Sequence, residues 1–258
     1  MKTAHALGWT VLLCLVGGSA DAIAYLRFGT FVGAMTGNTV LLGIDIADKD
    51  WNQAAYHFGI IVVFLLAVVG TRAALLQRVP LSLAHGVTVV ALGASEFVHG
   101  AWSAAIGAAA LGCQNAAVRK IGGVSINTAF ITGDLVRLGS ALPRASEPAH
   151  RNELAVLATA WIAYAAGAVL GAAALHGIGY PMFVPATLAL LAAILGLFGH
   201  QADDERSTAW SVSGLSALKA GVWFASFFAI ARRHLAASAG QVIDRNQIDN
   251  ADDCSGRD

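Results

Sequence analysis

Long apolar stretches that contain almost no charged side chain dominate this sequence. Asp, Glu, Lys and Arg make up 12% of its 258 residues, whereas about 25% is usual in a soluble domain. An α-helix needs about 20 mostly apolar residues to cross the hydrocarbon of a bilayer. The sequence therefore predicts an all-α, polytopic membrane protein and excludes a soluble enzyme. Nucleic acid is excluded as a partner because the 16 basic and 16 acidic residues cancel and form no basic stripe.

Six segments are candidates for transmembrane helices: Leu7–Leu26, Ala54–Leu76, Leu83–His99, Trp102–Val118, Leu154–Leu175 and Met182–Gly199. The third and fourth are nearly continuous, which indicates a helical hairpin that turns near Gly100. Two shorter stretches, Phe31–Ile46 and Val124–Leu142, have polar residues at their centres. Short stretches of this kind favour re-entrant or broken helices over full spans.

Basic residues in the loops favour six spans over eight, because cytoplasmic loops carry the excess of Lys and Arg. With a cytoplasmic N-terminus and six spans, the outer loops keep only Arg27 and Lys49 as basic residues. Eight spans would move Arg72, Arg78, Arg119 and Lys120 outside. We therefore expect a multi-pass protein of the bacterial inner membrane with both termini in the cytoplasm. We interpret the first segment as an uncleaved span, although Gly18-Ser19-Ala20 resembles a signal-peptide cleavage site.

The last part of the chain, residues 201–258, differs from the apolar body and is expected to be a polar cytoplasmic tail. An apolar run at Ala209–Ile230 is interrupted by Lys219, which is unfavourable in mid-bilayer. An interfacial helix at about 209–231 fits this run better than a further span. The predicted transmembrane domain is thus residues 1–200.

The two short stretches resemble each other, which indicates an internal duplication. Thr36-Gly37-Asn38-Thr39-Val40-Leu41-Leu42-Gly43 aligns with Thr132-Gly133-Asp134-Leu135-Val136-Arg137-Leu138-Gly139, and Ala67–Gly70 aligns with Ala168–Gly171. We therefore expect repeat one at about residues 7–100 and repeat two at about 101–200. Each repeat holds three of the predicted spans, an odd number, so the second would be inverted relative to the first. Inverted repeats with broken helices are common in transporters.

The motif Met35-Thr36-Gly37-Asn38, preceded by a span that contains Asp21, resembles the YoaK family of bacterial inner-membrane proteins. The second half agrees with this family through Gln114-Asn115, Asn127-Thr128 and Thr132-Gly133-Asp134. The resemblance covers about Leu7 to Gly199 and implies a multispanning membrane protein. The family is a domain of unknown function, so it implies no activity and no functional residue.

The two Thr-Gly segments are the first candidates for a substrate or ion site. Thr, Asn and Asp cap helix starts, and two helix N-termini directed inward would favour an anionic or carbonyl-bearing solute. The alternative is a capped turn with glycines spaced for helix packing, as in Gly29-Gly33-Gly37 and Gly167-Gly171. The candidate residues are Asp21, Thr36, Gly37, Asn38, Gln114, Asn115, Asn127, Thr132, Gly133, Asp134 and Arg137.

Individual charged groups admit two interpretations each. Asp21 is a candidate cation or proton site, or else it pairs with Arg27 or a loop amide. Arg137 forms an ion pair with Asp134 or contacts an anionic substrate. Glu96 and His99 are three residues apart, so on a helix they would share one face and favour a proton relay or a helix-end hydrogen bond over a metal site.

No catalytic, nucleotide-binding or cofactor motif occurs in the sequence, so we expect no cofactor and no bound metal. The leading hypothesis is a small secondary transporter or channel for a small polar solute, in contact with the lipid bilayer. The alternatives are a membrane-embedded enzyme acting on a lipid-like substrate and a non-catalytic accessory membrane protein. A homodimer is compatible with a bundle of this size.

Overall fold

The computed structural model describes residues 2–77, 80–117, 120–121, 124–125, 131–145 and 147–199. The predicted interfacial helix of the tail and Asn127 lie outside these residues. The first half contains α1 (Lys2–Phe28), α2 (Met35–Ala47), α3 (Trp51–Leu76) and α4 (Leu81–Ser95). The second half contains α5 (Ala101–Ala117), the antiparallel strands β1 (Lys120–Ile121) and β2 (Val124–Ser125), α6 (Ile131–Ala141), a 3-10 turn (Leu142–Arg144), α7 (Pro148–Gly177) and α8 (Phe183–Gly199).

The observed helices confirm the helical class predicted from the apolar stretches. Three of them are long and apolar enough to cross a membrane: Leu7–Phe28, Trp51–Leu76 and Glu153–Gly177. Leu81–Ser95 and Phe183–Gly196 are shorter apolar helices. The two short stretches with polar centres form short helices, α2 with 13 residues and α6 with 11.

Helix α4 ends at Ser95, four residues before the predicted end of its span. The chain then turns into α5 through Gly100, whose φ of 62° is readily available only to glycine. The prediction that Glu96 and His99 share one helix face is therefore wrong, since both lie in the connection after the last helical turn.

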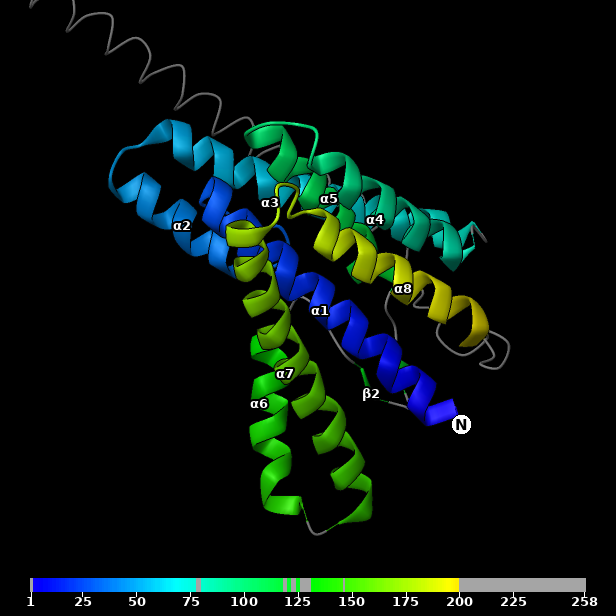
Figure 1. The fold of residues 1–258 in the computed structure, drawn as a ribbon. Helices are drawn as coiled ribbons and strands as arrows, with labels where there is room; N and C mark the ends of the chain where they lie inside the picture. The colour runs from blue at the N-terminus through cyan, green and yellow to red at the C-terminus, as the bar shows by residue number, and fades with distance from the viewer. Residues whose placement is uncertain are drawn as a thin grey trace, which may run out of the picture. The chain divides into compact units, whose positions relative to one another are not determined.

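Helix α1 lies against α7, α8 and α5, and α5 in turn packs on α3 and α4 (Figure 1). Helix α4 also packs on α8, while α2 and α6 form hairpins with the helices that follow them, α3 and α7. Buried side chains such as Val16, Ile23, Leu92, Leu111 and Met182 belong to the main apolar core. Smaller apolar clusters lie between α1 and α7 and between α1 and α8.

The contact between α1 and α7 depends on small residues. A Cβ atom on Gly167 or Gly171 would overlap the backbone of Leu15 or Ser19, and one on Gly18 would overlap the carbonyl of Tyr164. The packing predicted for the Gly167-Gly171 pair is thus confirmed. Gly29 does not belong to a packing stripe: it has φ of 69°, and its N–H bonds the Tyr25 carbonyl where α1 ends.

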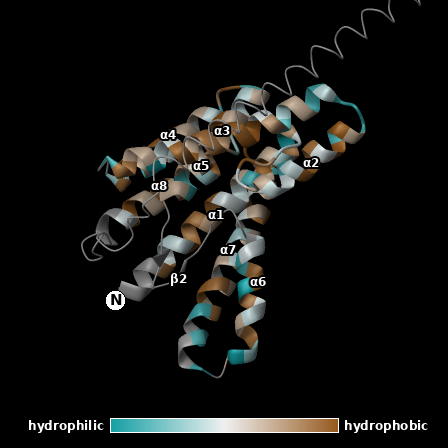
Figure 2. Cartoon of the chain, turned by 180° about the vertical axis from the view of Figure 1, so that it is seen from behind, coloured by the Kyte–Doolittle hydropathy of each residue, from teal (hydrophilic) through white to brown (hydrophobic). Residues whose placement is uncertain are grey.

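Apolar side chains also cover the outside of the helices. Val90, Trp102 and Val169 are 71%, 74% and 69% exposed. Figure 2 shows that hydrophilic residues gather instead at the tips of the α2–α3 and α6–α7 hairpins. Apolar outer faces with polar hairpin tips are the pattern of helices surrounded by lipid.

Candidate functional site

The connection between α1 and α2 is a break of six residues, 29–34, that is held by the carboxylate of Asp21. Oδ1 of Asp21 accepts the backbone N–H groups of Val32 at 2.8 Å, Gly33 at 2.6 Å and Ala34 at 3.3 Å. Its Oδ2 accepts the hydroxyl of Tyr164 from α7 at 2.6 Å. Asp21 is 3% exposed. Both carboxylate oxygens are therefore paired inside the protein.

Asn38, in the first turn of α2, closes the same break from the other side. Its Oδ1 accepts the Phe31 N–H at 2.8 Å and the Thr30 hydroxyl at 3.0 Å. Its Nδ2 donates to the Phe31 carbonyl at 2.6 Å. Asn38 is completely buried. These bonds supply partners for backbone groups that no longer belong to a helix, which a broken helix at membrane depth requires.

The backbone of the break is also tightly enclosed. A Cβ atom on Gly33 would lie 2.7 Å from Leu111 of α5 and 3.1 Å from Asp21 Oδ2. One on Gly37 would lie 2.7 Å from the ring of Phe31. These two glycines leave room for α5 and for a folded-back aromatic ring. Thr36, beside them, is exposed.

These bonds bear on whether the first Thr-Gly segment can bind an anion. Free N–H groups at the start of a helix bind anions, but here the chain's own carboxylate already binds the N–H groups that lead into α2. The sequence offered two alternatives to a cation site at Asp21, a pair with Arg27 or a bond to a loop amide. The structure shows the bond to loop amides. Arg27 pairs with Glu96 instead, with Nη1 2.8 Å from Oε1.

The second Thr-Gly segment, at the start of α6, is built differently. Thr132 and Gly133 are exposed, whereas Asp134 is buried. Nη1 of Arg137 lies 3.6 Å from Oδ1 of Asp134, which confirms the ion pair predicted for these two residues. A shorter contact of 2.6 Å joins Arg137 Nη2 to Oε1 of Glu153 in α7.

Gln114 and Asn115 lie on α5. The Nε2 of Gln114 donates to the Leu13 carbonyl of α1 at 3.1 Å, and its Oε1 has no hydrogen-bond partner among the described residues although Gln114 is 1% exposed. The Nδ2 of Asn115 bonds the carbonyl of Leu111 in its own helix at 2.8 Å. An uncompensated buried amide oxygen is unfavourable, so Gln114 offers a hydrogen-bond acceptor in the interior.

Glu96 serves as a junction of three helix ends. Besides the Arg27 guanidinium at the end of α1, it accepts the Met182 N–H at 2.6 Å, immediately before α8 begins. His99, three residues later, is exposed. The structure therefore separates the two residues that the sequence paired as a relay. Among the described residues, no group of three or more His, Cys, Asp and Glu side chains is placed to hold a metal ion.

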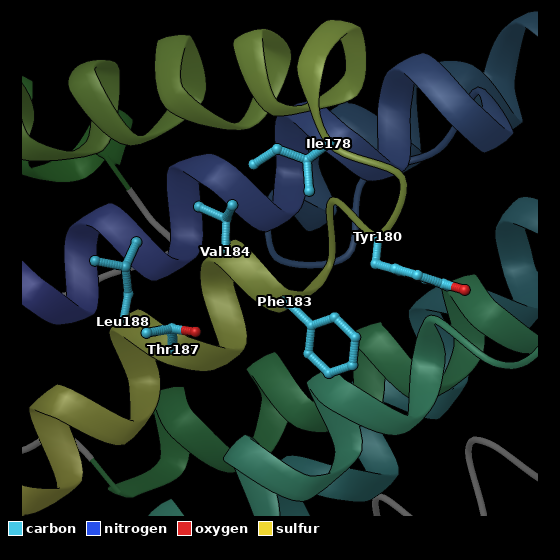
Figure 3. Close-up of a pocket in the computed structure, with 6 residues that line it drawn as sticks. All are labelled: Ile178, Tyr180, Phe183, Val184, Thr187 and Leu188. Carbon is cyan, nitrogen blue, oxygen red and sulfur yellow. The ribbon is translucent and has the colours of Figure 1, made fainter.

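An open apolar hollow of about 320 Å³ lies at the connection of α7 to α8. Figure 3 shows the lining side chains, from the connection and from the first turns of α8: Ile178, Tyr180, Phe183, Val184, Thr187 and Leu188. The rings of Tyr180 and Phe183 stand 6.1 Å apart. This lining supplies almost no polar atoms and no acid–base pair, so the hollow fits an apolar chain better than a polar solute.

Sequence reasoning missed three partners in these sites. Tyr164 is the single tyrosine of the Ala-rich helix α7, and the need of its hydroxyl for a partner was a usable signal. Glu153 lies just before the predicted fifth span, so it was not considered as a partner for Arg137. The third is the pair of His57 and Asp45: His57 is 5% exposed, and its Nδ1 lies 2.6 Å from Oδ2 of Asp45.

Comparison with known proteins agrees with this architecture. Residues 9–198 match the model of a family described as "Protein of unknown function (DUF1275)". The chain belongs to the DUF1275 family. It is similar to the UPF0700 transmembrane protein RA0705 of Rhizobium meliloti (strain 1021), with 26% identity over 192 residues, which are 74% of this chain and 85% of that protein. No solved structure matches the chain significantly. The family match spans α1 to α8, and with the apolar helices it indicates a membrane protein.

Proposed function

We propose that this protein is a small secondary transporter or channel for a small polar solute, built from two inverted repeats. The observation that carries the proposal is the symmetry of helix packing. If α1, α2, α3 and α4 are exchanged for α5, α6, α7 and α8, the contact of α1 with α7 becomes that of α5 with α3. The other main helix contacts are likewise preserved: α2–α3 becomes α6–α7, α1–α8 becomes α5–α4, and α4–α8 becomes itself.

Close glycine contacts repeat the same symmetry. Gly18 of α1 meets the backbone of α7 at Tyr164 and Ala168. Gly112 of α5 meets α3, where its Cβ would lie 2.7 Å from the Phe64 carbonyl and 2.9 Å from Ala67. Ala67 and Ala168 are aligned residues of the two sequence repeats. A duplicated helix crossing explains why a glycine stands at both places.

The directions of the helices support six crossings in alternating directions. Leu15 and Ser19 of α1 meet Gly167 and Gly171 of α7 in the same order, so these two helices run parallel at their contact. In contrast, α1 and α8 are antiparallel: Gly8 lies near Leu195, whereas Arg27 and Met182 both bond Glu96. Six spans that alternate in direction, three in each repeat, require these relative directions.

In this proposal the polar residues divide into two groups. Asp21 and Asn38 are positioning residues, because their bonds to the chain shape the break. The groups available to a solute are the exposed Thr36, Thr132 and Gly133 and the unpaired Oε1 of Gln114. The candidate site also includes the remaining polar candidates of the second repeat, which are Asn115, Asn127, Asp134 and Arg137.

The same proposal includes the YoaK subgroup, the location in the inner membrane and the cytoplasmic side of both termini. The paired Thr-Gly motifs support a place with the YoaK proteins within the DUF1275 family. The basic loop residues support an inner-membrane protein with both termini in the cytoplasm.

The alternative of an enzyme on a lipid-like substrate has one supporting observation, the open apolar hollow beside α8. It requires polar reacting groups beside that hollow, and the described lining offers only the hydroxyls of Tyr180 and Thr187. An accessory protein would need the helix packing alone. We favour transport because two broken-helix segments in symmetric positions exceed what packing requires.

Thiol labelling from two sides tests the inverted architecture. After replacement of Cys14, Cys113 and Cys254, single cysteines are placed at the exposed hairpin-tip residues Asp48 and Ala145. A membrane-impermeant reagent should label Asp48→Cys in intact cells, and Ala145→Cys only after permeabilisation. Labelling of both from the same side would overturn the inverted repeat.

Transport itself is tested with the purified protein in liposomes. Currents on solid-supported membranes are recorded for a panel of small carboxylates, amino acids, sugars and amines. A solute that gives a current in wild-type vesicles, and a weaker one with Thr36→Val or Thr132→Val, would support the proposal. The matched control is Thr39→Val. In the wild-type protein the Thr39 hydroxyl donates to the Met35 carbonyl of its own helix at 2.9 Å. If no member of the panel gives a current that depends on the protein, the enzyme and accessory alternatives take precedence.

A further inference from the structure

Nε1 of Trp9 in α1 and Oε1 of Gln114 in α5 are buried and have no hydrogen-bond partner among the described residues. The amide nitrogen of Gln114 donates to the carbonyl of Leu13, which lies one turn after Trp9 on the same face of α1. Since a carbonyl can only accept, this bond fixes the orientation of the amide and leaves its oxygen available. An indole nitrogen can only donate. The interior thus offers one donor and one acceptor.

Trp9 and Gln114 lie towards the same end of a group of four helices, α1, α4, α5 and α8. The ring centroid of Trp9 lies 5.5 Å from that of His85, near the start of α4. Helices α4 and α5 form a hairpin in which the Thr88 hydroxyl bonds the Ala110 carbonyl. One turn further from the hairpin connection, His85 and Gln114 lie at the same level on these two helices.

Helix α8 carries a glycine opposite the Trp9 indole nitrogen. A Cβ atom on Gly196 would lie 3.3 Å from Nε1 of Trp9, and the three nearest heavy atoms that it would meet all belong to the Trp9 ring. Any side chain at position 196 would therefore stand directly against the indole N–H. Glycine leaves this place open.

From this geometry we propose a binding site between α1, α4, α5 and α8 for a neutral solute that carries both a donor and an acceptor, such as a small carboxamide. The carbonyl oxygen of the solute would accept from Nε1 of Trp9, and its N–H would donate to Oε1 of Gln114. A few placed polar groups in an apolar lining are typical of small-molecule sites. As the transported substrate, this solute rests on the proposed function, whereas its binding does not.

The absence of charge on the four helices indicates a neutral solute. Helices α4, α5 and α8 contain no Asp, Glu, Lys or Arg, and α1 has none between Lys2 and Asp21. The buried Asp134 lies on α6, which packs on α7. An ionised solute without a counter-ion is costly to bury. The site therefore favours amides and hydroxylated compounds over carboxylates and amines.

The other end of the same helices is fastened by Glu96. Its carboxylate bonds the Arg27 guanidinium at the end of α1 and the Met182 N–H just before α8 begins. The solute would therefore enter from the end where α1 begins, which is the expected cytoplasmic side.

Nitrogen-15 NMR of the indole groups tests the site on the full chain in nanodiscs, with the Trp9 resonance assigned by its loss in Trp9→Phe. The probes are acetamide and acetate, which have nearly the same size and shape but differ in charge. Because ligands this small bind weakly, both are titrated into the high millimolar range. We expect acetamide to shift the Trp9 resonance saturably and acetate to leave it unchanged. Trp102, which is 74% exposed, is the internal control and should respond to neither.

Two variants with matched controls give the second arm. Gln114→Leu removes the acceptor and should raise the Kd for acetamide about 3- to 10-fold, the loss of one neutral hydrogen bond. Gly196→Ala places a methyl group against the indole N–H and should abolish the saturable shift. The controls are Gln53→Leu at an exposed position and Gly59→Ala, where nothing lies within 4 Å of the added Cβ. Both should bind acetamide as the wild type does.

The wild-type titration alone can overturn the inference. If acetamide gives no saturable shift, the two polar atoms hold water only, and an equal response to acetate would refute a neutral site. Unchanged binding in both Gln114→Leu and Gly196→Ala would also overturn it. A protein that binds acetamide in this way but transports no solute in liposomes would refute the proposed function and leave the site in place.

Discussion

The hydroxyl of Tyr164 donates a 2.6 Å hydrogen bond to Oδ2 of Asp21, which joins α7 to the carboxylate that holds the entry to α2. The bond connects the two halves of the chain. The other oxygen of the same carboxylate accepts three backbone N–H groups. One side chain therefore holds the local shape of the break and also bonds the long helix across from it.

Replacing Tyr164 by Phe tests this connection. The variant leaves Oδ2 of Asp21 without its buried donor, and hydrogen bonds to charged groups contribute about 1.5–3 kcal/mol. We expect the free energy of unfolding to fall by about 2 kcal/mol in an SDS titration of the purified protein. Tyr180→Phe is the control, because Tyr180 is 58% exposed. Equal stability of the two variants would contradict a role for the Tyr164 hydroxyl.

Substitutions of Asp21 should distinguish its oxygen acceptor from its charge. Asp21→Ala leaves the N–H groups of Val32, Gly33 and Ala34 unpaired, so we expect a loss of about 3 kcal/mol or more. Asp21→Asn keeps one oxygen for these donors and should lose less. Asp48→Asn, at an exposed hairpin tip, should stay within about 0.5 kcal/mol of wild type. Thermal unfolding in detergent measures the order, and an Asp21→Asn variant less stable than Asp21→Ala would refute it.

The contact between Arg137 and Glu153 predicts a charge-reversal result. Arg137→Glu brings a third carboxylate beside Asp134 and Glu153, so the yield of folded protein should drop. Adding Glu153→Arg should restore most of it, because the exchanged pair keeps the opposite charges. The recovered free energy should be about 1 kcal/mol or less, since both partners are partly exposed, 38% and 30%. Failure of the double variant to exceed Arg137→Glu in a fluorescence-detected chromatography assay would argue against the pair.

The helices were predictable from sequence because the signal for them is local. Apolar runs and the polar centres of two short stretches predicted the eight α-helices of the described residues, but several of the predicted bounds differ from those observed. Val124 and Ser125, predicted to begin the second short stretch, form strand β2, and helix α6 starts only at Ile131. Helix α7 starts six residues before the predicted Leu154, and α4 ends early because the turn through Gly100 takes up Glu96 to His99. Partners separated along the chain were harder to predict. Asp21 and Tyr164 are 143 residues apart, and no spacing rule relates them.

The candidate site was predicted as a set of residues but not as an arrangement. The Thr-Gly motif correctly indicated a broken helix, yet sequence alone did not tell whether Asp21 and Asn38 would bind a solute or the chain. The bonds decide that each has its partners within the break. His57 was missed for a related reason: Asp45 comes close only when α2 folds back on α3.

The two aligned glycines Gly171 and Gly70 should respond oppositely to the same substitution. A Cβ on Gly171 would overlap the backbone of Ser19, which cannot move aside without separating α1 from α7. We expect Gly171→Ala to lower the free energy of unfolding by about 1–3 kcal/mol, the usual cost of overpacking. Nothing lies within 4 Å of a Cβ on Gly70 in α3. Gly70→Ala should therefore stabilise the protein by up to about 1 kcal/mol through helix propensity. Both are measured by SDS titration, and similar responses of the two variants would show that the α1–α7 contact is looser than the structure has it.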